Sequence, residues 1–199
     1  MSPPDLQTAE ALLLEAQTMN PGPWVPHSRN VALAARLIAE QHPDLDPERT
    51  YILGLLHDIG RRGGPNKDRH ILDGYDILMD LGYPDAAQIA LTHSFPMQNP
   101  AELLAWDGSQ SELERLTRLL ESVSYTTEDR LLQLCDKLAL PEGCCILEKR
   151  MVDIALRYPF SSLKTEKWRF VFGIKAEFDR AVGQSIYRLL PGIVETTLS

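Results

Sequence analysis

The residues best suited to chemistry in this sequence are a histidine and an aspartate that stand side by side, His57 and Asp58. The six residues before them, 51–56, are mostly apolar, and Ile59 and Gly60 follow. Such an apolar run predicts a buried helix, and a buried carboxylate is costly unless it is paired, hydrogen-bonded or bound to a metal ion. Because adjacent helical residues point about 100° apart, the two side chains can flank one ion at the end of that helix.

Four further residues with ligand-type side chains fall on apolar helical stripes or at their ends. His27 shares a stripe with four apolar residues of its own predicted helix, and Asp136 lies inside the run LLQLCDKLAL. His93 follows an isoleucine by one helical turn, and His70 begins another predicted helix. The fifth histidine, His42, lies at a polar helix end, where we expect it at the surface.

Each of these residues alone is most simply a hydrogen-bonded core residue, whereas the joint pattern favours a metal centre. Nitrogen and oxygen ligands without a thiolate suit a divalent transition metal such as Mn, Fe, Co, Ni or Zn, and Mg is also possible. The sequence therefore predicts a site for one or two divalent ions.

In this order the residues resemble the HD-domain superfamily of metal-dependent phosphohydrolases, which is named for the His-Asp doublet. The resemblance covers residues 24–140, and the segment His-Asp-Ile-Gly at 57–60 is similar to the HDIG type. The resemblance implies that four residues hold one metal ion: His27, His57, Asp58 and Asp136. His70 and His93 match the subset of the superfamily that binds two ions, in which the aspartate of the doublet bridges them.

The resemblance also implies an activity, in which metal-bound hydroxide cleaves a phosphoester or phosphoanhydride bond of a small metabolite, most simply a nucleotide or dinucleotide. Two ions about 3.5–4 Å apart can share a hydroxide, lower its pKa and hold a phosphoryl oxygen in line for attack. In this scheme Asp58 is catalytic, because it bridges the ions and orients the hydroxide. His70 is the second catalytic candidate. Either His70 or His93 would act as a metal ligand or as a proton donor.

Candidate cations for the phosphoryl oxygens follow the doublet directly. The loop 61–69 carries an excess of three positive charges in a chain of net charge −8, and Arg61, Arg62 and Lys67 are its substrate-binding candidates. Lys137 is a fourth candidate, because it follows the predicted ligand at position 136. A solvated surface loop, or a lysine on a polar helix face, stays open as the alternative.

Two other functions also stay open. A smaller group of diiron oxygenases uses the same six ligands to cleave C–C or C–P bonds, and iron retention with oxygen uptake would reveal it. A regulatory module could bind a nucleotide at such a site without turnover. The sequence contains no phosphate-binding glycine-rich loop, dinucleotide-binding fingerprint or nucleophile elbow that would supply a competing chemistry.

Composition restricts the partners and the compartment. The chain has 199 residues, 44% hydrophobic and 24% charged, as in ordinary globular proteins. A net charge of −8 argues against a nucleic-acid polymer or an anionic membrane as the main partner, since both need a basic face. No apolar run approaches the roughly 18–20 residues that span a bilayer, and the first residues lack a signal-peptide pattern. Three cysteines without a CxxC spacing favour a reducing, cytoplasmic compartment.

The elements that must position these residues are helical almost throughout. Apolar residues recur three and four positions apart in these segments: 5–18, 24–41, 47–59, 70–81, 85–94, 110–123, 127–139, 145–158 and 163–189. Only 168–174 alternates enough to suggest a strand, and we prefer a helix there. The sequence predicts a single all-α domain of the HD type with about eight or nine helices. The core motif occupies 24–140, and helices in 141–199 pack on this bundle or form a homodimer contact.

Overall fold

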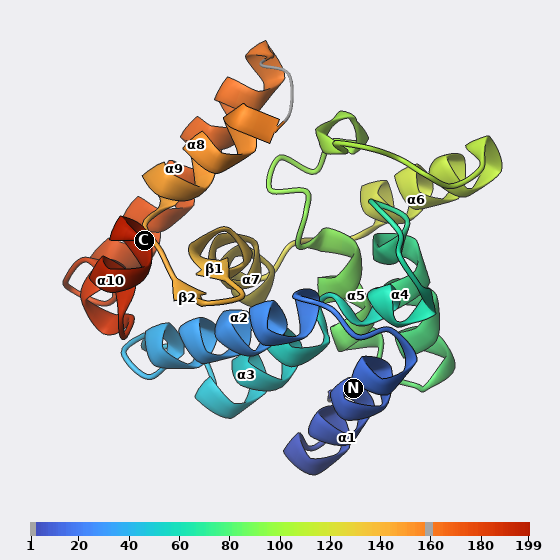
Figure 1. Cartoon of the computed structure of the whole chain (residues 1–199), viewed down its shortest axis with the longest axis horizontal. Helices are drawn as coiled ribbons and strands as arrows, with labels where there is room; N and C mark the ends of the chain where they lie inside the picture. Colours follow the sequence, from blue (N-terminus) through green and yellow to red (C-terminus); the bar gives the residue numbers. More distant parts are fainter. Residues whose placement is uncertain (1–2, 158–160) are drawn as a thin grey trace.

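The structure is a computed structural model that describes residues 3–157 and 161–199. Within these residues the chain forms helices and one short hairpin (Figure 1). The α-helices are α1 (Leu6–Met19), α2 (Trp24–Ala39), α3 (Pro47–Leu56), α4 (His70–Asp80), α5 (Pro84–Thr92), α6 (Gln110–Ser122), α7 (Thr127–Leu138), α8 (Leu147–Arg157), α9 (Ser162–Ala181) and α10 (Ile193–Leu198). Short 3₁₀ helices are η1 (Ile59–Gly63), η2 (Pro100–Glu102) and η3 (Ile186–Leu189), and the antiparallel strands are β1 (Ala139–Leu140) and β2 (Gly143–Cys144). The all-α prediction is confirmed.

The helix that leads to the His-Asp doublet is shorter than the sequence pattern predicts. The pattern continues to residue 59, but α3 ends at Leu56, and His57 follows as its C-cap. Asp58, with φ −104° and ψ 13°, leaves the helical conformation and precedes η1. The buried Ile59 continues the apolar pattern in the sequence and hides this break. The two side chains of the doublet are therefore placed by a helix end and not by the helical repeat.

The C-terminal part also differs from the prediction of one helix over 163–189. α9 ends at Ala181, and Gly183, with φ 72°, takes the chain out of the helix before η3 begins. Residues 168–174 lie within α9 and are helical, as preferred. The short hairpin and α10 were not predicted, because two-residue strands and a six-residue helix leave no periodicity to detect.

Two glycines let the elements around the doublet approach closely. A Cβ atom at Gly54 would lie 2.6 Å from the Cα atom of Ala32, so α3 crosses α2 with backbone against backbone. A Cβ atom at Gly60 would lie 2.0 Å from the carbonyl oxygen of His70, so η1 packs directly on the start of α4. A side chain at either position would push these elements apart.

A buried polar network fixes α7 against α5. The Asp129 carboxylate in the first turn of α7 is fully buried and accepts hydrogen bonds from Thr92 Oγ1 at 2.5 Å and Gln88 Nε2 at 2.8 Å, both on α5. It also accepts the amide and hydroxyl protons of the residue that caps α7. A network in which every group is bonded holds one arrangement, and it thereby places Asp136 of α7 relative to His93 after α5.

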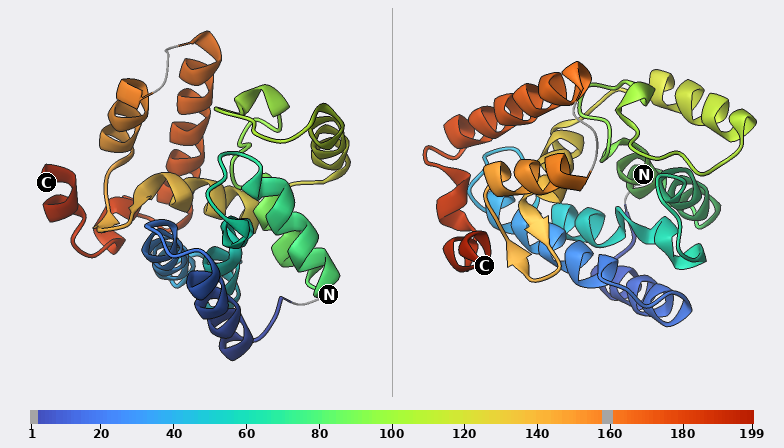
Figure 2. Two further views of the ribbon diagram at one scale, coloured as in Figure 1. Left: turned by 45° about the vertical axis from the view of Figure 1, so that its right-hand side comes forward. Right: turned by 45° about the horizontal axis from the view of Figure 1, so that its top comes forward.

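The C-terminal helices lie against the bundle from one side. α8 and α9 run beside each other, while α1 lies at the opposite end of the molecule (Figures 1 and 2). Met151 of α8 and Val171, Ile174 and Phe178 of α9 belong to the main apolar core. α6 instead covers a second apolar cluster with α4 and α5.

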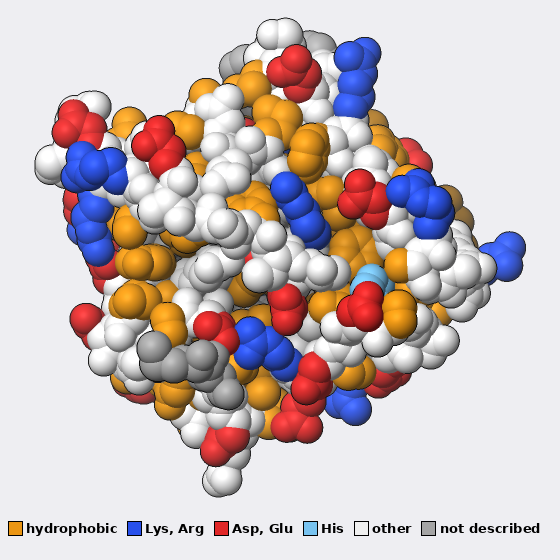
Figure 3. Space-filling model, turned by 180° about the vertical axis from the view of Figure 1, so that it is seen from behind, with side chains coloured by type: hydrophobic (Ala, Val, Ile, Leu, Met, Phe, Trp, Pro, Cys, Tyr) orange, Lys and Arg blue, Asp and Glu red, His pale blue; other side chains and the backbone are white. Residues whose placement is uncertain are grey.

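The surface carries mixed charge. On the face in Figure 3, basic and acidic side chains are interspersed around apolar patches. Within the described residues, no helix combines the length and the apolar character that crossing a bilayer requires.

Candidate metal centre

The six predicted ligands come from five helices and meet at one buried place. His27 lies on α2, Asp136 on α7, and His70 is the first residue of α4. His57 and His93 are the C-caps of α3 and α5, and Asp58 follows His57. None of the six exposes more than 8% of its surface. His42 lies apart from them, with its ring against Phe178.

One group of ligand atoms combines α2, α3 and α7. His27 Nε2 is hydrogen-bonded to Asp136 Oδ1 at 3.0 Å, and His57 Nε2 lies 3.8 Å from the same oxygen. Ligand atoms of the three side chains all lie within 4.8 Å of one another. This spacing fits three ligands of one ion.

A second group is arranged around the Asp58 carboxylate. Its Oδ2 atom lies 3.9 Å from His57 Nε2, and its Oδ1 atom lies 3.7 Å from His93 Nε2 and 3.0 Å from His70 Nε2. His57, Asp58 and His93 offer ligand atoms within 4.8 Å of one another, and His57 therefore belongs to both groups. The Asp58 carboxylate therefore lies within 4 Å of three imidazoles.

Backbone hydrogen bonds orient three of the imidazoles. Nδ1 of His57 donates to the Gly54 carbonyl at 2.8 Å, and Nδ1 of His93 donates to the Ala90 carbonyl at 2.9 Å. Nδ1 of His70 bonds in the same way to a carbonyl oxygen three residues earlier. A proton on Nδ1 leaves Nε2 as the electron-pair donor, which is the usual arrangement of a metal-ligating histidine.

Two of the converging atoms have no hydrogen-bond partner in the described part of the chain. They are Nε2 of His57 and Oδ1 of Asp58, both buried. A buried polar atom left without a partner costs about 1–3 kcal/mol, and the cost is larger for a charged group. Both atoms are electron-pair donors and point into the same cluster, so the residues present fit a divalent cation.

The charges of the site are those that metal ligation requires. Burial, the largest single influence, would raise the pKa of Asp58, but the Arg61 guanidinium together with His70 and His57 holds this pKa well below its usual range. Burial would likewise raise the pKa of Asp136, but the Lys137 ammonium together with His27 and His93 lowers it well below its usual range. Burial lowers the pKa of His57, and it lowers the pKa of His93 to about 3. Charged carboxylates and neutral imidazoles are the ligand forms of these side chains.

The structure places some of the predicted substrate-binding cations at the site and others away from it. Arg61 lies in the site, where its Nε donates to Asp58 Oδ2 at 2.7 Å and its Nη2 donates to His70 Nε2 at 3.2 Å. Lys137 reaches the site through an ion pair with Asp136. Arg62 pairs instead with Glu15 of α1 at 3.1 Å.

Lys67, the remaining candidate, is exposed, and its backbone supports the site. Its carbonyl accepts the His70 Nδ1 bond, and its amide donates to Asp107 at 2.7 Å. Asp68 in turn accepts from the amides of Leu104 and Ala105. These bonds tie together the two long loops that follow α3 and α5.

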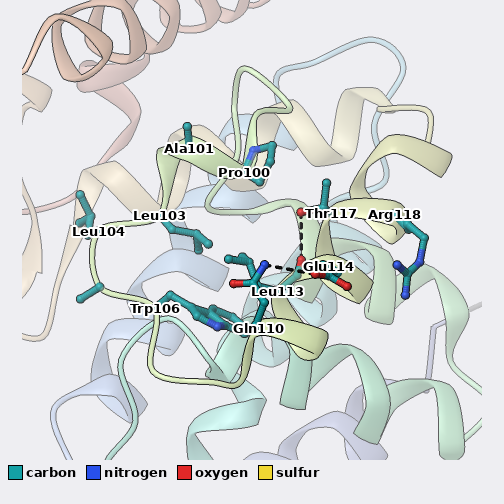
Figure 4. A pocket seen from close by; sticks show the side chains of 11 residues that line it. Pro100, Ala101, Leu103, Leu104, Trp106, Gln110, Leu113, Glu114, Thr117 and Arg118 are labelled. Atoms are coloured by element: carbon teal, nitrogen blue, oxygen red, sulfur yellow. Dashed lines mark hydrogen bonds between the residues drawn. The ribbon is translucent and has the colours of Figure 1, made fainter.

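The loop before α6 also forms an apolar pocket of about 670 Å³ with that helix. Leu103, Trp106 and Leu113 line this pocket (Figure 4). None of the predicted ligands or cations is among the described residues that line it. Trp106 thus packs at this pocket and not at the metal centre.

Two residues beside the site were not predicted. Lys167 of α9 donates from Nζ to the Ser94 carbonyl at 2.7 Å, directly after His93, and pairs with Glu102 Oε2 at 3.3 Å. Glu102 and Lys167 lie far apart in sequence, and no local pattern links them. The only sequence feature that could have pointed to Lys167 is the helical repeat of α9, which places Lys164 and Lys167 one turn apart on one face.

One comparison with known proteins gives a match. The family model described as HD domain matches residues 25–140, which is more than half of the chain. No curated protein and no solved structure gives a significant match. The matched range contains all six predicted ligands and ends before α8.

Proposed function

The chain belongs to the HD-domain family, and from this we propose that it is a metal-dependent phosphohydrolase. Its substrate in this proposal is a small phosphorylated metabolite, most simply a nucleotide or dinucleotide, cleaved at a phosphoester or phosphoanhydride bond. The observation that carries the proposal is a pair of buried electron-pair donors, His57 Nε2 and Asp58 Oδ1, which have no hydrogen-bond partner among residues 3–157 and 161–199. They lie in a cluster that contains the neutral imidazole of His57 and the charged carboxylate of Asp58.

The residues that would hold the metal divide into two sets that share His57. His27, His57 and Asp136 form the first set, and Asp58 with His93 completes the second. His70 adds a further nitrogen at Asp58. A bound divalent ion would supply Lewis acidity toward a phosphoryl oxygen and would lower the pKa of a water molecule toward neutrality.

The protein's own cations would bind and orient the phosphoryl group. The guanidinium of Arg61, whose Nε and Nη2 atoms donate to Asp58 and His70, would place a positive charge beside a phosphoryl group bound at Asp58. Lys137 contributes a second positive charge at Asp136. Both charges would offset the negative charge on the non-bridging oxygens as the bond breaks.

The burial of the site would support the same chemistry. The six predicted ligands are almost completely covered, and the loops 61–69 and 96–110 are joined to each other by hydrogen bonds of Asp68 and Asp107. Excluding bulk water strengthens each charge interaction inside the site.

The test is to measure metal content and phosphate release on the same preparations. Metal-loaded wild-type protein should release inorganic phosphate from at least one member of a nucleotide and dinucleotide panel. Asp58→Asn should lose that activity while its circular dichroism stays helical, and His42→Gln serves as a control histidine outside the cluster.

Three results would contradict the proposal. Iron retention with oxygen uptake and without phosphate release would assign an oxygenase. Tight nucleotide binding without product would assign a regulatory module. Full activity of Asp58→Asn would show that the reaction occurs elsewhere.

A further inference from the structure

A second cluster of cations lies beside the candidate metal centre. Lys137 of α7, Arg150 of α8, and Lys164 and Lys167 of α9 line one largely enclosed cavity between these three helices. The other described residues that line it are apolar, and no carboxylate is among them. Three of the four cations lie beyond residues 25–140, on helices that the family match does not cover.

Arg150 is the most informative member of the cluster. Its Nε atom is buried and has no hydrogen-bond partner among the residues that the structure describes. The side chain as a whole is only partly buried, but a buried donor atom left without an acceptor costs about 1–3 kcal/mol, and more when its group is charged. The donor is therefore arranged for an acceptor that the described residues do not provide.

Two carboxylates beside the cavity are already engaged by other cations. Asp136 pairs with Lys137, and Glu102 pairs with Lys167. Arg150 forms no comparable ion pair among the described residues. Burial, followed by the neighbouring Lys137, lowers the pKa of Lys167 to about 8, as expected where cations are crowded together.

The size and lining of the cavity restrict its occupant. Its volume is about 50 Å³, roughly the space of three to five water molecules. This space admits a tetrahedral oxyanion and excludes a nucleobase. Apolar walls lower the local dielectric constant, so that each cation interacts more strongly with an anion.

The cavity adjoins the metal centre through two of its cations. Lys137 contacts Asp136, and Lys167 contacts the carbonyl of Ser94, the residue after His93. We propose that this cavity is a phosphate subsite that binds a second phosphoryl group of the substrate, one that is not cleaved. The assignment of both groups to one molecule rests on the proposed phosphohydrolase function. The substrate class is then a molecule with at least two phosphoryl groups, selected by α8 and α9.

The binding test uses the purified full-length protein and methylenediphosphonate, a non-hydrolysable molecule with two phosphoryl-type groups. Calorimetric titration should show binding to wild type and at least a tenfold (~1.4 kcal/mol) weaker affinity for Arg150→Gln. Lys149→Gln, which removes the neighbouring charge on the same helix, is the matched control and should bind like wild type. Equal affinities for wild type and Arg150→Gln would overturn the subsite.

Thermal unfolding distinguishes a ligand-binding arginine from a structural one. Without ligand, Arg150→Gln should unfold at the wild-type temperature or above, because the substitution removes a buried Nε donor that no described residue satisfies. The rise in unfolding temperature on adding methylenediphosphonate should be smaller than in wild type. A variant that is less stable without ligand, and is still stabilised by methylenediphosphonate as wild type is, would show that Arg150 has a structural role only.

Kinetics then separate this inference from the proposed function. In metal-loaded protein, Arg150→Gln should raise KM for nucleotides with two phosphoryl groups at least about tenfold and leave nucleoside monophosphates unchanged. An equal effect on both substrate classes would overturn the subsite. If Arg150→Gln loses methylenediphosphonate binding but wild type hydrolyses no substrate, the anion subsite stands and the hydrolase proposal fails.

Discussion

The two halves of the metal centre differ in how their charges are balanced. The His27 half consists of His27, His57 and Asp136, and the His70 half consists of Asp58, His70 and Arg61. In the His27 half, Nε2 of His57 is buried without a partner among the described residues. In the His70 half, Oδ1 of Asp58 also has no hydrogen-bond partner among the described residues, but the Arg61 guanidinium already bonds to Oδ2 of that carboxylate and to the imidazole.

This difference implies unequal affinities for metal. The His27 half presents nitrogen and oxygen donors. Its cation, Lys137, donates to Oδ2 of Asp136, whereas His27 contacts the other oxygen, Oδ1. The His70 half contains a cation in contact with the ligand atoms that a second ion would need. A second ion there must compete with Arg61, so the His27 half, completed by Asp58, is the stronger site.

The largest effect is expected from removing that competing cation. Arg61→Ala should lower kcat/KM for phosphate release by about 10²–10³-fold, because a charge-assisted contact to the phosphoryl group is lost. The amount of metal per chain should not fall, and should rise if the second position was only partly filled. Parallel kinetics and elemental analysis check both statements, and a fall in metal content would contradict the contrast between the halves.

A smaller effect concerns pH and the metal-free protein. Burial lowers the folded-state pKa of His93 to about 3, below its ordinary value of 6.5, so the unfolded chain takes up a proton first as pH falls. Above about pH 6.5 His93 is neutral in both states and does not lower the free energy of unfolding. Between pH 7 and pH 5, protonation of His93 in the unfolded chain lowers the free energy of unfolding by about 2 kcal/mol. Urea unfolding of chelator-treated wild type and His93→Gln checks this. The wild type should show the steeper loss, and parallel curves would contradict it.

The smallest effect is expected at Arg62, which has the same charge as Arg61 and is its neighbour in sequence. Its ion pair with Glu15 is largely exposed on the carboxylate side. Arg62→Ala should change the free energy of unfolding by less than about 1 kcal/mol and leave phosphate release and metal content unchanged. A kinetic defect similar to that of Arg61→Ala would show that both arginines face the substrate.

The contrast between Arg61 and Arg62 also shows what the sequence could and could not predict. The ligand set was accessible because His27, His93 and Asp136 fall on apolar helical stripes, and periodicity predicts which face of a helix is buried. The choice between two adjacent arginines depends on the 3₁₀ geometry of η1, and the apolar Ile59 conceals where α3 stops.

The cationic cavity was beyond prediction for a different reason. Lys137, Arg150 and Lys167 meet only because α8 and α9 pack against α7, and that packing is a long-range property. The lysines and arginines of residues 145–189 have the spacing of ordinary solvated helix faces. Only the packed structure shows that Arg150 points inward.

The most direct test of the account is the amount of metal per chain in wild type, His57→Ala and His70→Ala, with His42→Gln as the control. His57 belongs to both groups of ligand atoms, so His57→Ala should retain almost no metal. His70→Ala should keep the ion of the His27 half, at close to one per chain. Metal retained at the wild-type level by His57→Ala, or lost completely by His70→Ala, would contradict the account.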